Sequence, residues 1–184
     1  MKKTGVICIS VLSVIILPAC FFIAMRKIYP VKYTNEISTY ANQNDIPPYI
    51  IASLVNTESS FDKNAYSNKK AIGLMQIKLS TAEYMIDYYN LPDEIDETQL
   101  FDVETNLKFG CLYLKYLQTK FKNLDTAFAA YNAGETVVRS WLKNEEYSSD
   151  GISLNYIPYQ ETAQYLNKIN KNIKHYKKIK KFKK

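Results

Sequence analysis

An apolar run without a single charge dominates the N-terminus of this chain. It extends from Gly5 to Met25 and is flanked on each side by a pair of basic residues. As an α-helix, a run of this length would measure about 31 Å, enough to cross the hydrocarbon core of a bilayer. We therefore expect a single transmembrane helix within residues 1–27, so that only the residues beyond it can build a water-soluble core.

The same run contains a second signal. Residues 17–20, Leu-Pro-Ala-Cys, resemble the cleavage box of a bacterial lipoprotein, in which Cys20 would carry the lipid. The apolar residues 21–25 favour the transmembrane helix instead, because a mature lipoprotein usually turns polar after its cysteine. Either attachment places the rest of the chain at one membrane surface, and the flanking charges are too balanced to predict which surface.

Charge divides the chain into three parts. Residues 1–32 carry five Lys/Arg and no acid, residues 33–161 carry ten Lys/Arg and 18 Asp/Glu, and residues 162–184 carry nine Lys and no acid. The net charge of +6 therefore hides an acidic central part. This division and the lack of a recognition motif argue against nucleic-acid binding. The lysine-rich C-terminus from Lys174 to Lys184 suits contact with an anionic surface.

The low histidine and cysteine content excludes several kinds of active site. The chain has one His, at position 175, and three Cys, at positions 8, 20 and 111. Sites with several histidine ligands and a disulfide framework are excluded, and we expect no metal and no cofactor. The 16 Tyr and 8 Phe among 184 residues are typical of one folded domain with its own core.

Helical signals dominate after the apolar run, and no hairpin turn or repeat interrupts them. We expect one all-α domain over residues 36–178, preceded by a tether over residues 28–35 and followed by a basic tail over residues 179–184. Residues 135–143 are expected to form one of about six helices. The expected helix boundaries are Asp45 with Pro47 and Pro48, Ser80 in a capping box with Glu83, Asp102, Asp125, Gly134 as a stop, and Pro158.

Glu58 is the carboxylate that the helical pattern singles out. It follows Ile51, Leu54 and Val55 at helical spacing, so a helix through this segment points Glu58 along its buried face. A carboxyl group among apolar neighbours has a raised pKa and can hold a proton near neutral pH, as a general acid must. The pattern alone equally fits an acid paired with a lysine or capping the next turn.

Four blocks of sequence, in order, closely resemble the catalytic domain of the soluble-type lytic transglycosylases. This is a lysozyme-like family related to goose-type lysozyme, and the resemblance spans roughly residues 36–170. The blocks are Glu58-Ser59-Ser60-Phe61 with Ala65, Ser67, Ala71, residues 73–77 and Thr81-Ala82; Asn106 and Gly110 with Tyr113-Leu114; Ala130-Tyr131-Asn132-Ala133-Gly134 with Val137; and Pro158-Tyr159-Gln160-Glu161-Thr162 with Tyr165.

The resemblance implies a lysozyme-like helical fold and cleavage of peptidoglycan glycan strands between N-acetylmuramic acid and N-acetylglucosamine. Glu58 matches the catalytic glutamate, acting as acid and then as base, and the product is a 1,6-anhydromuramic acid end. The implied substrate-binding residues are Ser67, Met75, Gln76, Tyr131, Asn132, Glu161 and Tyr165. The enzyme is expected to be held in the cell membrane by its single N-terminal helix, with the catalytic domain on the extracytoplasmic side.

Two other functions remain open. Glu161 as a second carboxylate would suit a lysozyme-like muramidase that uses water, and a wall-binding scaffold could retain the fold without activity. The chain also departs from the family pattern, since Lys63 and Leu79 stand where proline is usual and Lys70 where glycine is usual. These departures concern the geometry of the loop after Glu58 and not the proposed acid.

Overall fold

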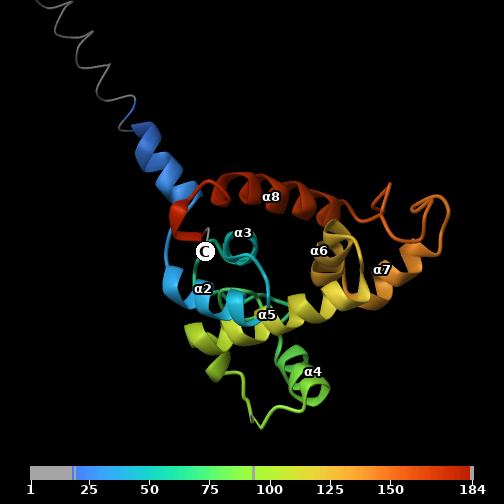
Figure 1. Cartoon of the computed structure of the whole chain (residues 1–184), viewed down its shortest axis with the longest axis horizontal. Helices are drawn as coiled ribbons and strands as arrows, with labels where there is room; N and C mark the ends of the chain where they lie inside the picture. Colours follow the sequence, from blue (N-terminus) through green and yellow to red (C-terminus); the bar gives the residue numbers. More distant parts are fainter. Residues whose placement is uncertain (1–17, 19, 93, 183–184) are drawn as a thin grey trace, which may run out of the picture.

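The computed structural model describes residues 18, 20–92 and 94–182. Within them the fold is all-α, as expected, and the β pairing is confined to the isolated bridges Tyr66–Ile72 and Ile72–Ile77. The helices are α2 (Thr34–Gln43), α3 (Pro48–Glu58), α4 (Leu79–Tyr89), α5 (Val103–Lys120), α6 (Leu124–Ala133), α7 (Glu135–Leu142) and α8 (Gln160–Tyr176), with the short 3-10 helices η1 (Gln99–Phe101) and η2 (Lys180–Phe182) (Figure 1).

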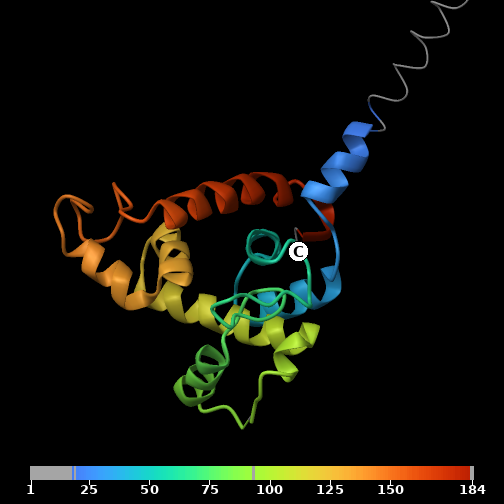
Figure 2. The same cartoon turned by 180° about the vertical axis from the view of Figure 1, so that it is seen from behind.

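α3 forms the centre of the domain. It packs most extensively against α8, with α2 on its other side, and α2 in turn packs on α5 (Figures 1 and 2). Nine of the eleven residues of α3 are buried, including the polar residues Ser53, Asn56 and Thr57. The helix is therefore buried on all sides and has no exposed stripe. Glu58, its last residue, is half-buried.

Residues 20–28 form a helical stretch that projects from one end of the domain (Figure 1). Most of the expected transmembrane helix lies outside the described residues. Among the helices that are described, none has both the length and the apolar character that a membrane span requires. Residues 29–33 connect the helical stretch to α2, a helix that the sequence patterns did not single out.

Two of the expected helix boundaries are confirmed. The side chain of Asp102 accepts a hydrogen bond from the backbone N–H of Thr105 and caps α5. Gly134 ends α6 with a φ of 94°, a conformation that favours glycine because it has no Cβ. α7 closely matches the helix expected over residues 135–143.

Four other boundaries are corrected. α3 begins at Pro48, as the prolines indicated, but Asp45 lies in the turn before it and does not cap it, because Pro47 occupies the capping position. Ser80 is already inside α4, so it forms no capping box. Asn123 caps α6 in place of Asp125, by accepting from the N–H of Thr126. α8 begins at Gln160, two residues after Pro158.

The side chain of Asn106 joins α5 to the loop between α3 and α4. Its Nδ2 donates to the carbonyl oxygens of Ile72 and Leu100, each at 2.8 Å, and its Oδ1 accepts from the backbone N–H of Met75 at 2.8 Å. One turn further along α5, the side chain of Met75 occupies the space where a Cβ on Gly110 would lie. The hydrogen bonds of the buried Asn106 amide hold this loop against α5, and Gly110 leaves the space in which Met75 packs.

We predict that Asn106→Ala lowers the free energy of unfolding by about 2–4 kcal/mol, because it leaves the buried carbonyl of Leu100 and the buried N–H of Met75 without partners and removes one of the two hydrogen bonds to the carbonyl of Ile72. Urea unfolding followed by circular dichroism measures the change, and Asn42→Ala, which truncates an exposed asparagine on α2, is the control. Equal stability of the two variants would contradict the role given to Asn106.

Candidate active site

Glu58 ends α3 at the edge of a cleft, and a tyrosine holds its carboxyl group from behind. The hydroxyl of Tyr165 on α8 donates to Glu58 Oε1 at 2.7 Å, and the ring of Tyr165 is buried. The next residue, Ser59, donates through its Oγ to the carbonyl of Leu74 at 2.8 Å. The end of α3 is therefore fixed both to α8 and to the loop that follows.

The surroundings of Glu58 favour its protonated form. Burial raises the pKa of Glu58 from 4.5 to about 7, although the hydrogen bond from Tyr165 and the charge of Lys168 both lower this pKa. Lys168 is directed elsewhere, since its Nζ donates to the carbonyl of Thr57 at 2.6 Å. Near neutral pH a substantial fraction of Glu58 thus carries a proton that it can donate to a group in the cleft.

The cleft has a volume of about 510 Å³ and brings together most of the residues expected to form the site. Six of the eight line it: Glu58, Ser67, Gln76, Tyr131, Asn132 and Glu161. They come from the end of α3, the loop between α3 and α4, the end of α6 and the first turn of α8. These segments lie up to about a hundred residues apart in the sequence.

Met75 and Tyr165, the other two expected substrate-binding residues, lie outside the cleft lining. The side chain of Met75 is fully buried, and its carbonyl oxygen accepts from the hydroxyl of Tyr131 at 2.8 Å. Tyr165 is buried, and its hydroxyl donates to Glu58. Both residues therefore support the cleft from inside the core, where a substrate would not contact their side chains.

The loop between α3 and α4 has non-glycine residues at positive φ, and one of them is the cleft residue Gln76. Gln76 has a φ of 51°, and its Nε2 donates to the carbonyls of Gly73 at 3.0 Å and Ala65 at 3.3 Å. Lys70, where the family pattern has glycine, has a φ of 58°. A residue other than glycine in this left-handed region costs about 1–2 kcal/mol of conformational free energy. Lys70 therefore adopts the backbone conformation that glycine would adopt more easily.

Two carboxylates line the cleft in contrasting environments. Glu58 is desolvated, whereas Glu161 is exposed and forms an ion pair with Lys69, with 3.7 Å between Nζ and Oε1. An exposed pair of this kind contributes little to stability. Different environments for two acids in one cleft are the condition under which they take different chemical roles.

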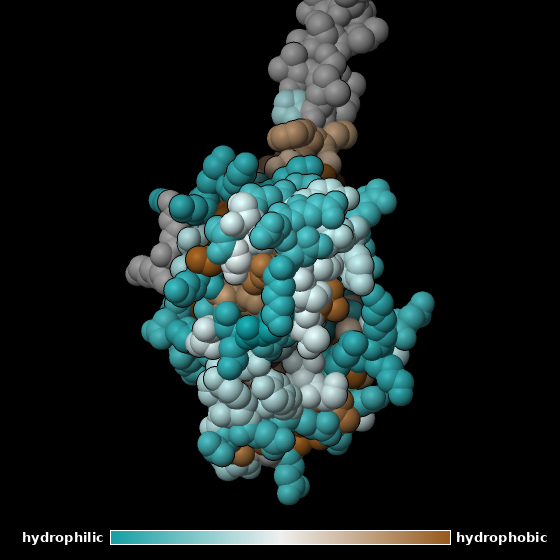
Figure 3. All heavy atoms as spheres, turned by 90° about the vertical axis from the view of Figure 1, so that its right-hand side faces the viewer, coloured by the Kyte–Doolittle hydropathy of each residue, from teal (hydrophilic) through white to brown (hydrophobic). Residues whose placement is uncertain are grey.

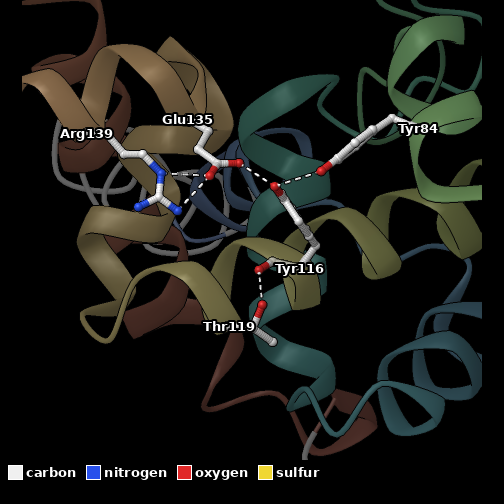
Figure 4. Close-up of polar contacts among 5 residues, drawn as sticks. All are labelled: Tyr84, Tyr116, Thr119, Glu135 and Arg139. Carbon is white, nitrogen blue, oxygen red and sulfur yellow. Dashed lines mark hydrogen bonds and ion pairs between the residues drawn. The ribbon is translucent and has the colours of Figure 1, made fainter. Parts of the chain in front are cut away.

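Tyrosine side chains join helices α4, α5 and α7 beside the cleft. Tyr116 on α5 donates to Glu135 Oε2 at 2.6 Å and shares a hydrogen bond with Tyr84 of α4 at 3.1 Å (Figure 4). Glu135, at the start of α7, also accepts from Arg139 Nε at 2.8 Å. This network links α4, which carries the cleft residue Thr81, to the start of α7, directly after the cleft residue Gly134.

The cleft also contains residues that the sequence patterns did not assign to the site: Asn68, Lys69, Ala71, Ile77, Lys78, Thr81, Tyr113, Ala133 and Gly134. Tyr113 belongs to the same sequence block as Asn106, so its block, although not its role, was visible in the sequence. The described residues include no group of three His, Cys, Asp or Glu side chains placed to hold a metal ion.

The family model and two curated relatives identify the same family. The family model for the transglycosylase SLT domain matches residues 35–153. The chain is 31% identical over 147 residues to the soluble lytic murein transglycosylase of Escherichia coli K12, which covers 79% of this chain and 23% of that protein. It is 31% identical over 155 residues to the membrane-bound lytic murein transglycosylase E of Buchnera aphidicola, which covers 78% of this chain and 68% of that protein.

Solved structures agree with these relatives. The crystal structure of the 70 kDa soluble lytic transglycosylase of Escherichia coli superimposes with a TM-score of 0.74 and 31% identity, covering 81% of this chain and 24% of that chain. An inactive variant of the Pseudomonas aeruginosa lytic transglycosylase Slt, with glutamate replaced by glutamine, gives a TM-score of 0.73 and 26% identity over 83% of this chain and 25% of that chain. The chain thus spans about a quarter of these longer proteins.

We predict that Glu58→Gln stabilises the protein more at pH 8 than at pH 4. Below pH 4.5 Glu58 is neutral in both the folded and the unfolded protein. As the pH rises from 4.5 towards 7, Glu58 ionises in the unfolded protein but stays largely protonated in the folded protein. The free energy of unfolding of the wild type therefore falls, whereas that of the glutamine variant does not. The difference should reach about 3 kcal/mol above pH 7.

Urea unfolding of both proteins at pH 4, 6 and 8 measures this difference. Glu83→Gln, which removes an exposed acid on α4, is the control for the loss of a charge. A stability difference that does not change with pH would show that the cleft does not desolvate Glu58.

Proposed function

Because the chain belongs to the transglycosylase SLT family, with the expected all-α lysozyme-like fold, we propose that it is a peptidoglycan lytic transglycosylase with Glu58 as its catalytic residue. The observation that carries this proposal is the half-buried carboxyl of Glu58, held by Tyr165 at the edge of the cleft with a pKa near 7. The inactive glutamate-to-glutamine variant of the Pseudomonas aeruginosa relative supports an essential glutamate.

The proposed reaction needs only one carboxyl group. Protonated Glu58 gives its proton to the glycosidic oxygen, and the bond from that oxygen to C1 of N-acetylmuramic acid breaks with positive charge developing at C1. The carboxylate of Glu58 then takes the proton from the C6 hydroxyl of the same sugar, and O6 bonds to C1. The product is a 1,6-anhydro end, no water is consumed, and Glu58 is again protonated.

The other cleft residues would bind the glycan. Ser67, Gln76, Asn132 and Glu161 offer hydroxyl, amide and carboxylate groups to sugar hydroxyls and acetamido groups. Tyr131 has its hydroxyl directed to the carbonyl of Met75, so we assign its ring to the cleft wall. We assign Tyr165 a positioning role, because its side chain is buried and its hydroxyl donates to Glu58.

A muramidase is the second function to test, because Glu161 is another carboxylate on the same cleft. In that reaction Glu161 would activate a water molecule after Glu58 protonates the leaving oxygen. The ion pair of Glu161 with Lys69 and its exposure argue for a substrate contact instead. A wall-binding scaffold without activity has no need of a desolvated acid.

We also propose that the enzyme is attached to the cell membrane by residues 1–27, with residues 36–178 as the catalytic domain on the extracytoplasmic side. The apolar run and the relative named as membrane-bound transglycosylase E support this arrangement. Lipidation at Cys20 is the alternative attachment. The basic tail over residues 179–184 would lie close to the anionic surface.

We expect the full chain, purified in nonionic detergent, to release fragments from purified peptidoglycan with ends one water lighter than hydrolysis products. Glu58→Gln should lower the rate at least a hundredfold, the usual contribution of a general acid. Mass spectrometry of the muramic acid ends measures both, with Glu83→Gln as the control. Reducing ends would identify a hydrolase, and intact glycan from folded protein would favour the scaffold.

We predict that Tyr165→Phe moves the basic limb of the pH–rate profile to higher pH. The hydrogen bond from Tyr165 lowers the pKa of Glu58, so its removal keeps the acid protonated at a higher pH. The variant should lower kcat several-fold with little change in KM, because no substrate contact is lost. Rates on soluble glycan fragments between pH 5 and 9 measure this, with Tyr156→Phe, an exposed tyrosine, as control. An unmoved basic limb would refute the role of Tyr165.

A further inference from the structure

A second pocket lies where the N-terminal helical stretch joins the domain. Its volume is about 350 Å³, and it is separate from the cleft of Glu58. Its walls come from the end of the N-terminal stretch, α3 and its end, and the middle of α8. The lining residues are Lys27, Ile28, Tyr29, Asn56, Ser60, Lys168, Lys171 and Asn172.

The junction that forms this pocket is held by specific contacts. The ring of Tyr29 stacks on His175 with 3.8 Å between centroids. The hydroxyl of Tyr176 donates to the carbonyl of Pro30 at 2.8 Å, and Asn56 Nδ2 donates to the carbonyl of Ile28 at 3.1 Å. α8 and the N-terminal stretch meet at the same end of the domain in both views (Figures 1 and 2).

The pocket is strongly cationic. Lys27, Lys168 and Lys171 line it and are exposed, and the sequence of α8 has no acid after Glu161. Lys168 donates to a backbone carbonyl and not to a carboxylate, so its charge remains uncompensated by that contact. Three ammonium groups around one pocket favour an anion with several oxygen acceptors, such as a phosphate group.

An unsatisfied acceptor lies beside these cations. Asn56 is only 4% exposed, and its Oδ1 has no hydrogen-bond partner within the described part of the chain. Its Nδ2 is already used, by Ile28 and by Asn172 Oδ1, so a flipped amide would lose two bonds. This oxygen is almost fully covered, so a ligand hydroxyl would reach it only by displacing the side chains that cover it. Because an unpaired buried carbonyl is costly, a ligand that carries such a hydroxyl donor would be favoured.

The surface around the pocket changes from polar to apolar. Phe21, Phe22 and Ile23 of the N-terminal stretch are 60–68% exposed, and Ile28 at the pocket is 56% exposed. Figure 3 shows hydrophobic residues at the place where this stretch leaves the polar body of the domain. A cationic pocket directly below an exposed apolar helix has the arrangement of a lipid headgroup region next to acyl chains.

We propose that this pocket binds the headgroup of an anionic phospholipid with a hydroxylated headgroup, of the phosphatidylglycerol kind. The lysines contact the phosphate, a headgroup hydroxyl donates to Asn56 Oδ1, and the acyl chains lie along Phe21 to Ile28. The site belongs to the folded domain and is distinct from the basic tail. None of its residues lines the cleft, although the charge of Lys168 also lowers the pKa of Glu58.

The test is native mass spectrometry of the full chain in nonionic detergent, titrated with phosphatidylglycerol or phosphatidylcholine. We expect one tightly retained phosphatidylglycerol and weaker binding of phosphatidylcholine. Lys27→Ala/Lys171→Ala should weaken phosphatidylglycerol binding about tenfold or more, since each lysine at an anionic lipid surface contributes roughly a fivefold factor. The matched control is Lys174→Ala/Lys177→Ala, which removes two exposed lysines of the same end of the chain outside the pocket.

Three results would overturn the proposal. Equal weakening by both double variants would mean general attraction to a basic surface and not a pocket. Equal retention of phosphatidylglycerol and phosphatidylcholine would show that the lysines do not select an anionic headgroup. Displacement of phosphatidylglycerol by inorganic phosphate or glycerol phosphate at similar concentration would identify a soluble phosphate as the ligand. Glu58→Gln should bind the lipid like the wild type, so inactivity and failure of lipid binding are distinguishable.

Discussion

A helix that is buried on every side ends in a carboxyl group, and this constraint governs the rest of the domain. α3 can occupy the core because Ser53 and Thr57 donate to carbonyls one turn earlier, so their hydroxyls need no water. After Glu58 the chain leaves the helix at once, through Ser60 and Phe61 at positive φ, and Phe61 is buried beyond it. The abrupt exit leaves space for the cleft beside the carboxyl group and keeps the other sides dry.

The residues around the cleft differ in how far water reaches them. Burial in the core raises the pKa of Glu58, and the hydrogen bond from Tyr165 holds its carboxyl group in place. Residues of the loop after α3 and of α8, including Glu161, remain in contact with solvent, as the sugar-binding role that we propose for them requires. The hydrogen bonds of Asn106 hold this loop against α5.

Features with local causes could be predicted from the sequence, and features decided by packing could not. Asp102 caps its helix through an N–H three residues away, so the pattern suffices. Asp125 also has a side-chain oxygen that could cap a helix, but Asn123, two residues earlier, occupies the capping position of α6. Glu58 could be singled out from its apolar neighbours, although the reason is burial of the whole helix and not one face. Whether Met75 or Tyr131 faces the cleft depends on contacts with α5 and α6, which no spacing reveals.

The segment between the N-terminal stretch and α2, within the tether expected over residues 28–35, makes specific contacts with the domain. Tyr29 and Pro30 are bound to the end of α8, so the stretch and the domain are joined as one piece. In the membrane-attached enzyme that we propose, this junction would hold the cleft at a fixed distance from the bilayer surface. That enzyme would cut only the glycan layer at this distance, and strands farther out would have to approach the membrane.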